Sequence, residues 1–423
     1  MKNLDVLHLT TYESFGGAAR AAKRIFEALK TQPIDCKMFT MVKTSSDENI
    51  QLVQPNDPHA QLKYIHKLLK SNQRLKLSQK TNMESYGDIS AGIIDEINAH
   101  PASIIHLHWI NNLLSIEDIG KINKPIVWTL HDMWPFSGSE HYTHDSNAFF
   151  YETSQNVISS DNESNQTFEL KRKYWHEQKF KFVAPSKWLA ECARRSILTN
   201  KHDIRVIYYP IDFDFWSPKN SKHNKGFNFD VNKKKILFIG QNAVNNPTKG
   251  WDLLQRALMR LYEKSDIKFE LVVVGQSVEF DSNYPFTINS LGEILSDEIL
   301  VNLYSSVDVL VVPSRAEAFS QVTLEAQSCG LPVVGFDIGG IPDILIHKKT
   351  GWISPAYDLI DFSEGIHWIL SVEGRAEELG KDGRTHVIEN FSSKRIAQLY
   401  MDLYQQVIFG GKSELKIDLD NKL

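Results

Sequence analysis

Short strand-like runs alternate with helix-like segments along most of the chain. In the first half these runs lie at residues 4–9, 104–108, 126–130, 182–185 and 204–208. A second series lies at residues 235–239, 271–275, 309–312 and 333–336. Short buried strands that alternate with helices build parallel sheets from βαβ units. The pattern therefore predicts an α/β chain with two Rossmann-like domains.

Residues 308–345 contain the clearest predicted βαβ unit. The apolar run 309–312 stops at Pro313, as expected for a buried strand, and a short helical pattern follows. Gly330 stands where a helix C-cap belongs, and the run 333–336 predicts the next strand. Ligands of open α/β sheets bind beyond the carboxyl ends of the strands, so the loop after residue 312 is a candidate site.

Glu317 lies in that loop, and Glu325 lies in the predicted helix, with seven residues between them. Together with PSRAEAF, LEAQSCGLPVV and GGIPDIL, this spacing resembles the E-x7-E motif of retaining family-4 glycosyltransferases of GT-B fold. The resemblance implies two Rossmann-like domains that face a central cleft, with a C-terminal helix that crosses back to the first domain. It also implies that Glu317 lies beside the transferred sugar and that Glu325 holds the nucleotide ribose.

The implied reaction moves a hexosyl group from a nucleotide diphosphate sugar to a hydroxyl, with anomeric retention. The implied acceptor is a glycan or a lipid-linked glycan, as in bacterial surface-polysaccharide biosynthesis. Two alternatives stay open at this stage. One is a GT-B nucleotide-sugar 2-epimerase, and the other is a non-catalytic protein that binds nucleotide sugars.

The resemblance also implies residues that neutralise the donor diphosphate. Lys249, in PTKG, matches the lysine of the family, whereas Gln241 stands where the family usually has an arginine. Arg315 is a candidate replacement for that arginine, and Gln241 is the one hint of a non-catalytic protein.

Backbone groups are further candidates for the donor site. Gly275 ends a strand-like run and is expected to open toward the nucleotide. Phe319, Ser320 and Gln321 stand at the start of the helix that carries Glu325, where backbone N–H groups favour an anion.

The first half of the chain contributes two glycines and a histidine. Gly16 and Gly17 join the first run to a predicted helix at residues 18–29. A routine strand-to-helix turn also explains them, but the resemblance places them near the donor phosphates. His131 follows the run 126–130 and matches a histidine near the sugar, so we expect a site residue and assign no base role. Asp132 either orients His131 or caps a helix.

Composition limits the remaining possibilities. A chain of 423 residues is too long for one core, and a net charge of −5 argues against general nucleic-acid binding. The three cysteines lack metal spacing and suit a reducing cytoplasm. No run approaches ~20 apolar residues, and no signal peptide is recognised. We therefore expect a cytoplasmic enzyme without metal or cofactor, with the nucleotide sugar as its donor substrate.

The segment 57–84 has a basic and amphipathic pattern. Its cations are Lys63, Lys67, Lys70, Arg74, Lys76 and Lys80, and leucines and an isoleucine are interleaved with them. The pattern predicts either a solvated helix or a surface helix that rests on anionic lipid. The second alternative would place the enzyme at the inner face of the cell membrane, near a polyprenyl-linked acceptor.

The predicted domains follow from these assignments. Residues 1–210 form the acceptor-side domain and residues 211–390 bind the nucleotide sugar. Residues 391–410 form the returning helix, and residues 411–423 form a polar tail. Residues 145–167, rich in Ser and Asn, are expected to be a surface insertion.

Overall fold

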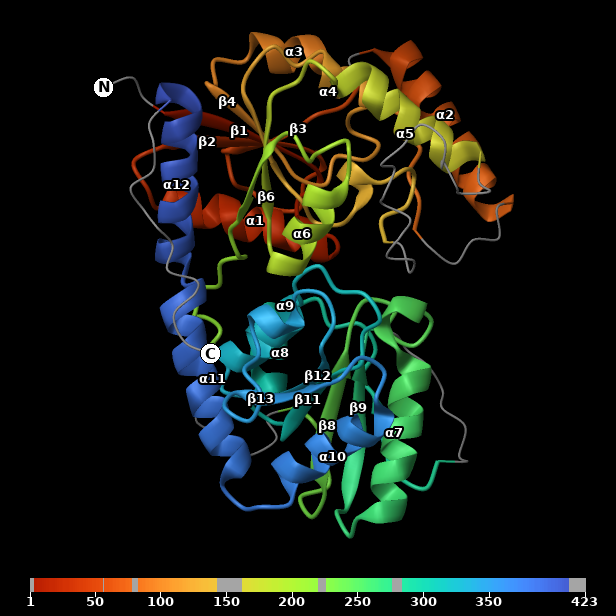
Figure 1. The fold of residues 1–423 in the computed structure, drawn as a ribbon, viewed down its shortest axis with the longest axis vertical. Coiled ribbons are helices and arrows are strands. Elements are labelled where there is room, and N and C mark those ends of the chain that lie inside the picture. Colours follow the sequence, from red (N-terminus) through yellow and green to blue (C-terminus); the bar gives the residue numbers. More distant parts are fainter. Residues whose placement is uncertain are drawn as a thin grey trace. The chain divides into compact units, whose positions relative to one another are not determined.

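The computed structural model describes residues 4–55, 57–77, 83–142, 162–219, 226–275 and 284–410. The chain divides into two compact units (Figure 1). Unit 1 comprises Met1–Pro185, Leu189–Ile207 and Lys394–Leu423, and unit 2 comprises Ser186–Trp188 and Tyr208–Ser393.

In the described part of unit 1, seven strands form one parallel sheet in the order β3-β2-β1-β4-β5-β6-β7. The strands are β1 (Asp5–Tyr12), β2 (Asp35–Val42), β3 (Ile50–Leu52), β4 (Ile104–Leu107), β5 (Ile126–Thr129), β6 (Phe180–Ala184) and β7 (Asp203–Val206). The helices are α1 (Gly17–Lys30), α2 (Pro58–Leu77), α3 (Ile94–Ala99), α4 (Ile116–Gly120), η1 (Trp134–Phe136), α5 (Asn162–Trp175), α6 (Lys187–Arg195) and α12 (Ser393–Phe409). The order reverses between β1 and β4, as in doubly wound nucleotide-binding folds.

The described part of unit 2 has a six-stranded parallel sheet in the order β10-β9-β8-β11-β12-β13. The strands are β8 (Lys234–Ile239), β9 (Phe269–Val274), β10 (Thr287–Ser290), β11 (Val309–Val312), β12 (Val333–Phe336) and β13 (Gly351–Ser354). The helices are η2 (Pro247–Lys249), α7 (Trp251–Lys264), α8 (Asp297–Tyr304), α9 (Gln321–Ser328), η3 (Ile341–Asp343), α10 (Leu359–Leu370) and α11 (Arg375–Phe391). Here the order reverses between β8 and β11.

Burial explains why these segments form strands and helices. Every residue of β9 and β11 is buried, as expected for strands that are covered on both faces of a parallel sheet. Helix α7 buries Leu253, Leu254, Ala257, Leu258 and Leu261, which share one face, and it packs against α10. Burial of one such leucine contributes about 1.5–3 kcal/mol, so this face holds the helix on the core.

Helix α12 packs on the sheet of unit 1 through two tyrosines. The Tyr400 hydroxyl lies 3.0 Å from Thr129 Oγ1, and the Tyr404 hydroxyl lies 2.6 Å from His106 Nδ1. This confirms a C-terminal helix that returns to the first domain. The helix begins at Ser393 because Ser392 is extended and separates it from α11.

The prediction of a surface insertion at residues 145–167 is wrong for the last six of these residues, which are helical. Helix α5 begins at Asn162, and residues 145–161 lie outside the described residues. The buried face of α5 contains Ser164, Thr167, Phe168, Lys171 and Trp175. Three of these five side chains are polar, so the face shows no apolar periodicity in the sequence. Lys171 Nζ donates hydrogen bonds to the carbonyls of Trp134, Ser137 and Gly138. These bonds compensate the loss of water around the buried amino group.

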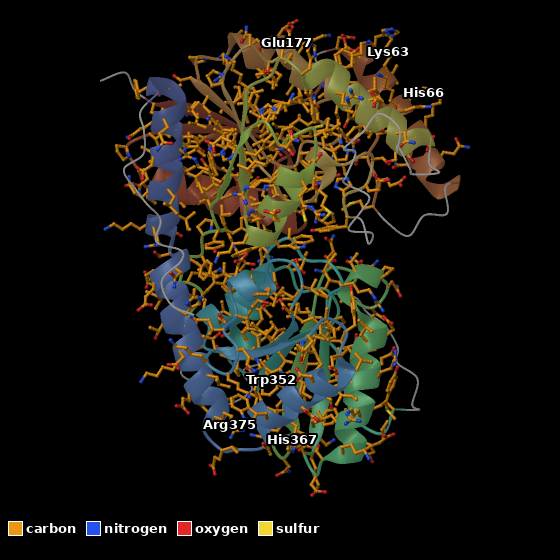
Figure 2. The ribbon with its side chains drawn as sticks, in the orientation of Figure 1. Lys63, His66, Glu177, Trp352, His367 and Arg375 are labelled. Carbon is orange, nitrogen blue, oxygen red and sulfur yellow. The ribbon has the colours of Figure 1, made fainter. Side chains whose placement is uncertain are left out.

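Helix α2 confirms the predicted helix for residues 58–77 of the basic segment, whereas Lys80 lies outside the described residues. The helix presents both apolar and basic side chains to solvent. Leu62, Ile65 and Leu69 are 67%, 50% and 64% exposed. Lys63, Lys67 and Lys70 are also exposed, and Figure 2 labels Lys63 on this helix. The opposite side is anchored by Tyr64, whose hydroxyl donates to the carbonyl of Asn112. No helix within the described residues is long and apolar enough to cross a membrane.

Candidate active site

The reversal of strand order in unit 2 defines the first group of candidate residues. The loops that follow β8 and β11 leave the sheet side by side, because these two strands pair directly. Ligands of doubly wound sheets bind at such a reversal, outside the carboxyl ends of the strands. Lys249 lies in the loop after β8 and Glu317 in the loop after β11. The structure therefore brings these two predicted residues together.

Lys249 and Glu317 form an ion pair. Lys249 Nζ lies 2.9 Å from Glu317 Oε2, and the two side chains are 25% and 14% exposed. Ser314 Oγ lies 3.4 Å from the same carboxylate oxygen. The pair is partly open to solvent, so an arriving anion can reach the ammonium group.

Gly250 allows the two loops to approach each other. It follows η2 with a φ of 73°, and a Cβ at this position would lie 2.0 Å from the carbonyl oxygen of Pro313. A side chain here would push the β8 loop away from the β11 loop. Gly250 therefore holds Lys249 within reach of Glu317.

Arg315 holds the same two loops together from the side. Its guanidinium makes two hydrogen bonds to the Asp252 carboxylate, at 2.8 and 2.6 Å, and a third to the carbonyl of Pro247. Its backbone N–H donates to the carbonyl of Thr248. Such a bidentate pair has fixed geometry, so Arg315 links the β11 loop to the segment that follows β8. Gln241 is exposed and brings no cation to this loop.

Two glycines that the sequence reasoning did not select support the Glu317 loop. A Cβ on Gly339, whose φ is 59°, would lie 1.9 Å from the carbonyl oxygen of Glu317. The N–H of Gly340 donates to that same carbonyl at 2.9 Å. The signal for both was present in the sequence, since two adjacent glycines stand just beyond the strand-like run 333–336, after Asp337 and Ile338.

The three residues at the start of α9 have different surroundings. Phe319 is 1% exposed, and its ring packs among those of Tyr208, Tyr209 and Phe391. Ser320 has a φ of 76°, unusual for a residue with a side chain, and its hydroxyl lies 2.7 Å from Thr323 Oγ1. Gln321 is the first helical residue. The first N–H groups of α9 have no partner within the helix, as at any helix start, which favours a bound anion there.

Glu325 and Gly275 have structural partners. Glu325 is 3% exposed, and its carboxylate accepts a hydrogen bond of 3.0 Å from the Tyr304 hydroxyl. Gly275 follows β9 with a φ of 120°, and a Cβ there would lie 1.7 Å from the carbonyl oxygen of Gly240. The close approach of two backbones requires this glycine. Roles of Glu325 and Gly275 in nucleotide binding stay predictions.

In unit 1, the reversal of strand order lies between β1 and β4. Gly16 follows β1 with a φ of 85° and precedes the first residue of α1, Gly17. Glu13, in the same loop, is fully buried, and its carboxylate accepts from Lys23 Nζ and from the N–H groups of Thr44 and Ser45. Burial alone would raise the pKa of Glu13, but these donors lower it to about 2. The buried carboxylate fixes the loop that carries the glycines.

His131 follows β5 and is 7% exposed. Its Nε2 lies 3.1 Å from Nδ1 of His108, whose Nε2 lies 3.0 Å from Nδ1 of His8. Burial lowers the pKa of His8 to about 3 and that of His131 to about 4. It also lowers the pKa of His108 well below the usual value. These imidazoles are therefore neutral near pH 7.

Asp132 orients two aromatic side chains. Its Oδ2 accepts from Trp109 Nε1 at 3.1 Å and lies 2.5 Å from Nδ1 of His141. Its Oδ1 accepts from the N–H of Trp134, the first residue of η1, and the N-cap residue of that short helix is Met133. Burial acts to raise the pKa of Asp132, but His141 and this N–H hold it below its ordinary value. The imidazole that Asp132 contacts at 2.5 Å is thus that of His141, and the orientation of His131 by Asp132 stays a prediction.

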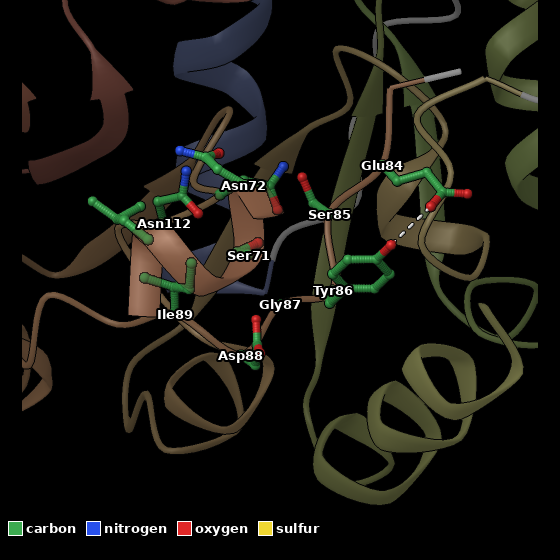
Figure 3. Close-up of a pocket in the computed structure, with 11 residues that line it drawn as sticks. Ser71, Asn72, Glu84, Ser85, Tyr86, Gly87, Asp88, Ile89 and Asn112 are labelled. Atoms are coloured by element: carbon green, nitrogen blue, oxygen red, sulfur yellow. Dashed lines mark hydrogen bonds between the residues drawn. The ribbon is translucent and has the colours of Figure 1, made fainter. Parts of the chain in front are cut away.

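A small polar cavity lies in unit 1 between α2, residues 84–89 and the turn at Asn111 and Asn112 (Figure 3). Its volume is about 50 Å³, and Tyr86 donates to Glu84 in its wall. The buried Asn111 Oδ1 has no hydrogen-bond partner among the described residues. One water needs roughly 10–15 Å³, so the cavity suits a few waters and is too small for a sugar ring.

Solved structures of other proteins share this fold over nearly the whole chain. Sucrose-phosphate synthase from Thermosynechococcus elongatus superposes with a TM-score of 0.67 and 19% identity, over 97% of this chain and 100% of that chain. The Anabaena protein HepE, in complex with UDP-glucose, superposes with a TM-score of 0.63 and 14% identity, over 95% and 99%. These likenesses confirm the predicted α/β fold class, GT-B with two Rossmann-like parts.

Sequence comparisons add a family match within unit 2. Residues 219–386, less than half of the chain, match the family model described as glycosyl transferases group 1. An uncharacterized glycosyltransferase of Methanocaldococcus jannaschii is 28% identical over 236 residues, 53% of this chain and 59% of its own length. N-acetyl-alpha-D-glucosaminyl L-malate synthase of Bacillus anthracis is 24% identical over 216 residues, 50% of this chain and 56% of its own length. The chain thus spans little more than half the length of these two relatives.

Proposed function

We propose that this chain is a retaining glycosyltransferase of family 4 that moves a hexosyl group from a nucleotide diphosphate sugar to a hydroxyl. The observation that carries the proposal is the ion pair of Lys249 and Glu317 at the reversal of strand order in unit 2. It places a cation and a carboxylate together where doubly wound folds bind nucleotides. The match of residues 219–386 to glycosyl transferases group 1, and the UDP-glucose bound to HepE, support a nucleotide sugar as donor.

The reaction needs two kinds of charge stabilisation. The departing diphosphate needs positive charge, and the sugar becomes cationic in the transition state. Lys249 and the N-terminus of α9, which begins at Gln321, supply the first. Glu317 supplies the second by holding sugar hydroxyls. With these groups in place the reaction needs no metal ion and no cofactor, and we assign no covalent nucleophile.

We place the acceptor on unit 1, near His131. We further propose that α2 rests on anionic lipid at the inner, cytoplasmic face of the cell membrane. Its exposed Leu62, Ile65 and Leu69 suit contact with acyl chains, and neighbouring lysines suit phosphate headgroups. The acceptor would then be a polyprenyl-linked glycan of surface-polysaccharide assembly.

A thermal-shift panel of nucleoside diphosphates tests the donor assignment. A ligand at about one hundred times its dissociation constant adds ~2.7 kcal/mol of stability, so one diphosphate should raise Tm clearly above the others. Incubation with the matching nucleotide sugar then separates the candidate functions. Transfer to an added glycan supports the proposal, an epimer formed without acceptor supports the 2-epimerase, and tight binding without turnover supports a non-catalytic protein.

A further inference from the structure

His8, His108 and His131 form a continuous hydrogen-bonded row in the core of unit 1, which we call the histidine row. His8 lies on β1 and pairs in register with His106 of β4. His108 lies two residues beyond His106, and His131 lies two residues beyond Thr129 of β5, so these side chains share one face of the sheet. The rings of His8 and His108 are inclined by only 12°, with centroids 5.3 Å apart. Nearly coplanar rings at that distance suit an in-plane N–H···N bond.

A row of neutral imidazoles has only two possible directions. Each neutral ring carries one N–H and one bare nitrogen, and each bond joins Nδ1 of one ring to Nε2 of the next. Either all three rings carry the hydrogen on Nδ1, or all three carry it on Nε2. The end of the row decides between these two arrangements.

The end of the row is Nε2 of His8, which is buried and has no hydrogen-bond partner among the described residues. A buried N–H without an acceptor is rare in proteins, and a bare acceptor is tolerated more often. The ring of Phe26, inclined by 78° to that of His8 with centroids 5.5 Å apart, contains no nitrogen or oxygen acceptor. Nε2 of His8 is therefore the bare nitrogen.

We infer that the histidine row runs in one direction, from His8 through His108, and holds His131 as the neutral tautomer with its hydrogen on Nδ1. Nε2 of His131 accepts the bond from His108, so it is not available to take a proton from an acceptor hydroxyl. The hydrogen of His131 lies on Nδ1 instead. His131 then serves transfer as a hydrogen-bond donor, and His8 and His108 are positioning residues. This consequence for transfer rests on the proposed function, whereas the tautomer does not.

A metal ion is the competing explanation for the buried histidines. Nitrogen atoms of His8, His106 and His108 lie within 4.8 Å of one another. Both nitrogens of His108 already take part in the row. Nδ1 of His106 lies 2.6 Å from the Tyr404 hydroxyl, and Nε2 of His106 lies 2.8 Å from Thr129 Oγ1. A metal with three ligands here would have to break the row, so zinc provides a direct test of the row.

Long-range 1H–15N spectra of the full chain, labelled with 15N-histidine, report the tautomers without any substrate. His131 and His108 are assigned from the signals lost in His131→Asn and His108→Asn. We expect both rings to carry the hydrogen on Nδ1, with Nε2 in the range of a bare nitrogen, unchanged from pH 6 to 8 and on addition of Zn²⁺. A hydrogen on Nε2 of His131, a titration within that range, or a zinc-induced shift of these signals overturns the inference.

Two variants of His8 test its role as the start of the row. In Asn, the amide nitrogen lies as many bonds from Cα as Nδ1 of histidine, so His8→Asn keeps a donor to His108. His8→Phe removes that donor. We expect the His131 signature to persist in His8→Asn and to change to a tautomer mixture in His8→Phe, with folding of both checked by circular dichroism. An unchanged signature in a folded His8→Phe protein overturns the role of His8.

Activity gives a second readout. His131→Asn keeps an N–H at the Nδ1 position, whereas His131→Gln places its amide at the Nε2 position. We expect transfer to fall less than about 10-fold in His131→Asn and about 100-fold in His131→Gln. Equal losses, or a larger loss in His131→Asn, overturn the donor role. If the wild-type chain transfers no sugar from any donor of the panel, the proposed function fails, and the spectra still decide the tautomer.

Discussion

Lys249 and Glu317 lie 68 residues apart in the sequence, yet their charged groups meet at 2.9 Å. They meet because β8 and β11 are neighbours in the sheet and both loops leave its carboxyl edge. Gly250 and Gly339 allow the backbones of these loops to approach closely, and the Arg315–Asp252 pair holds the loops in place. Without a ligand each charge is satisfied by the other, and a bound diphosphate would compete with Glu317 for the ammonium group.

Replacement of Glu317 should separate chemistry from binding. Glu317→Gln removes a charge that stabilises the cationic sugar, so we expect turnover to fall by ~10²-fold or more. The same change releases Lys249 from its ion pair, so the affinity for the nucleoside diphosphate should stay the same or increase. Steady-state kinetics and calorimetry measure the two effects. Unchanged turnover with the true substrates would show that Glu317 has no part in the reaction.

Replacement of Lys249 should weaken phosphate binding in particular. Because Gln241 provides no cation and Arg315 is paired with Asp252, Lys249→Ala should reduce affinity for a nucleoside diphosphate far more than for the nucleoside. Calorimetry with both ligands measures the difference. Lys264→Ala, an exposed lysine on α7, serves as the matched control and should bind like the wild type. Equal losses for the two ligands in Lys249→Ala would exclude a phosphate contact.

The face of α2 should bind anionic vesicles in a salt-dependent manner. Each cation near such a surface contributes ~1 kcal/mol, and the attraction falls with ionic strength. A triple variant with Lys63, Lys67 and Lys70 changed to Gln should sediment less with phosphatidylserine vesicles. A control with Lys173, Lys179 and Lys201 changed to Gln has the same net charge and should sediment like the wild type. Equal sedimentation of both variants would contradict a lipid-binding face on α2.

Stability should decline below pH 6.5. His8 and His131 have pKa values of about 3 and about 4 in the folded protein, against 6.5 when unfolded. Between those values the unfolded chain binds protons that the native state does not, so each histidine costs up to ~1.4 kcal/mol of stability per pH unit. Glu13, lowered from 4.5 to about 2, adds a further loss below pH 4.5.

Urea unfolding at several pH values between 5 and 8 measures this decline. His131→Asn should show a shallower decline than the wild type because one buried imidazole is gone. His176→Gln removes an exposed histidine and should leave the slope unchanged. Stability that is constant from pH 8 to 5 would contradict the lowered pKa values.

The sequence by itself determined the fold class. Strands such as Val309–Val312 are wholly buried and therefore wholly apolar, and glycines mark the turns between strands and helices, so local pattern was sufficient. The E-x7-E spacing with its flanking motifs located Glu317, and PTKG located Lys249. Helix α5 was missed at its start because its buried face contains Ser164, Thr167 and Lys171, whose burial depends on partners elsewhere in the chain.

Tertiary structure alone decided which of these residues act together. The pairing of Arg315 with Asp252, the support of Glu317 by Gly339 and Gly340, and the histidine row all depend on strand order. Strand order brings β1, β4 and β5 together across about 120 residues, and periodicity within one segment contains no information about its neighbours. The burial that makes His8 and His131 neutral arises in the same way, because it comes from helices and strands distant in the sequence that pack around them.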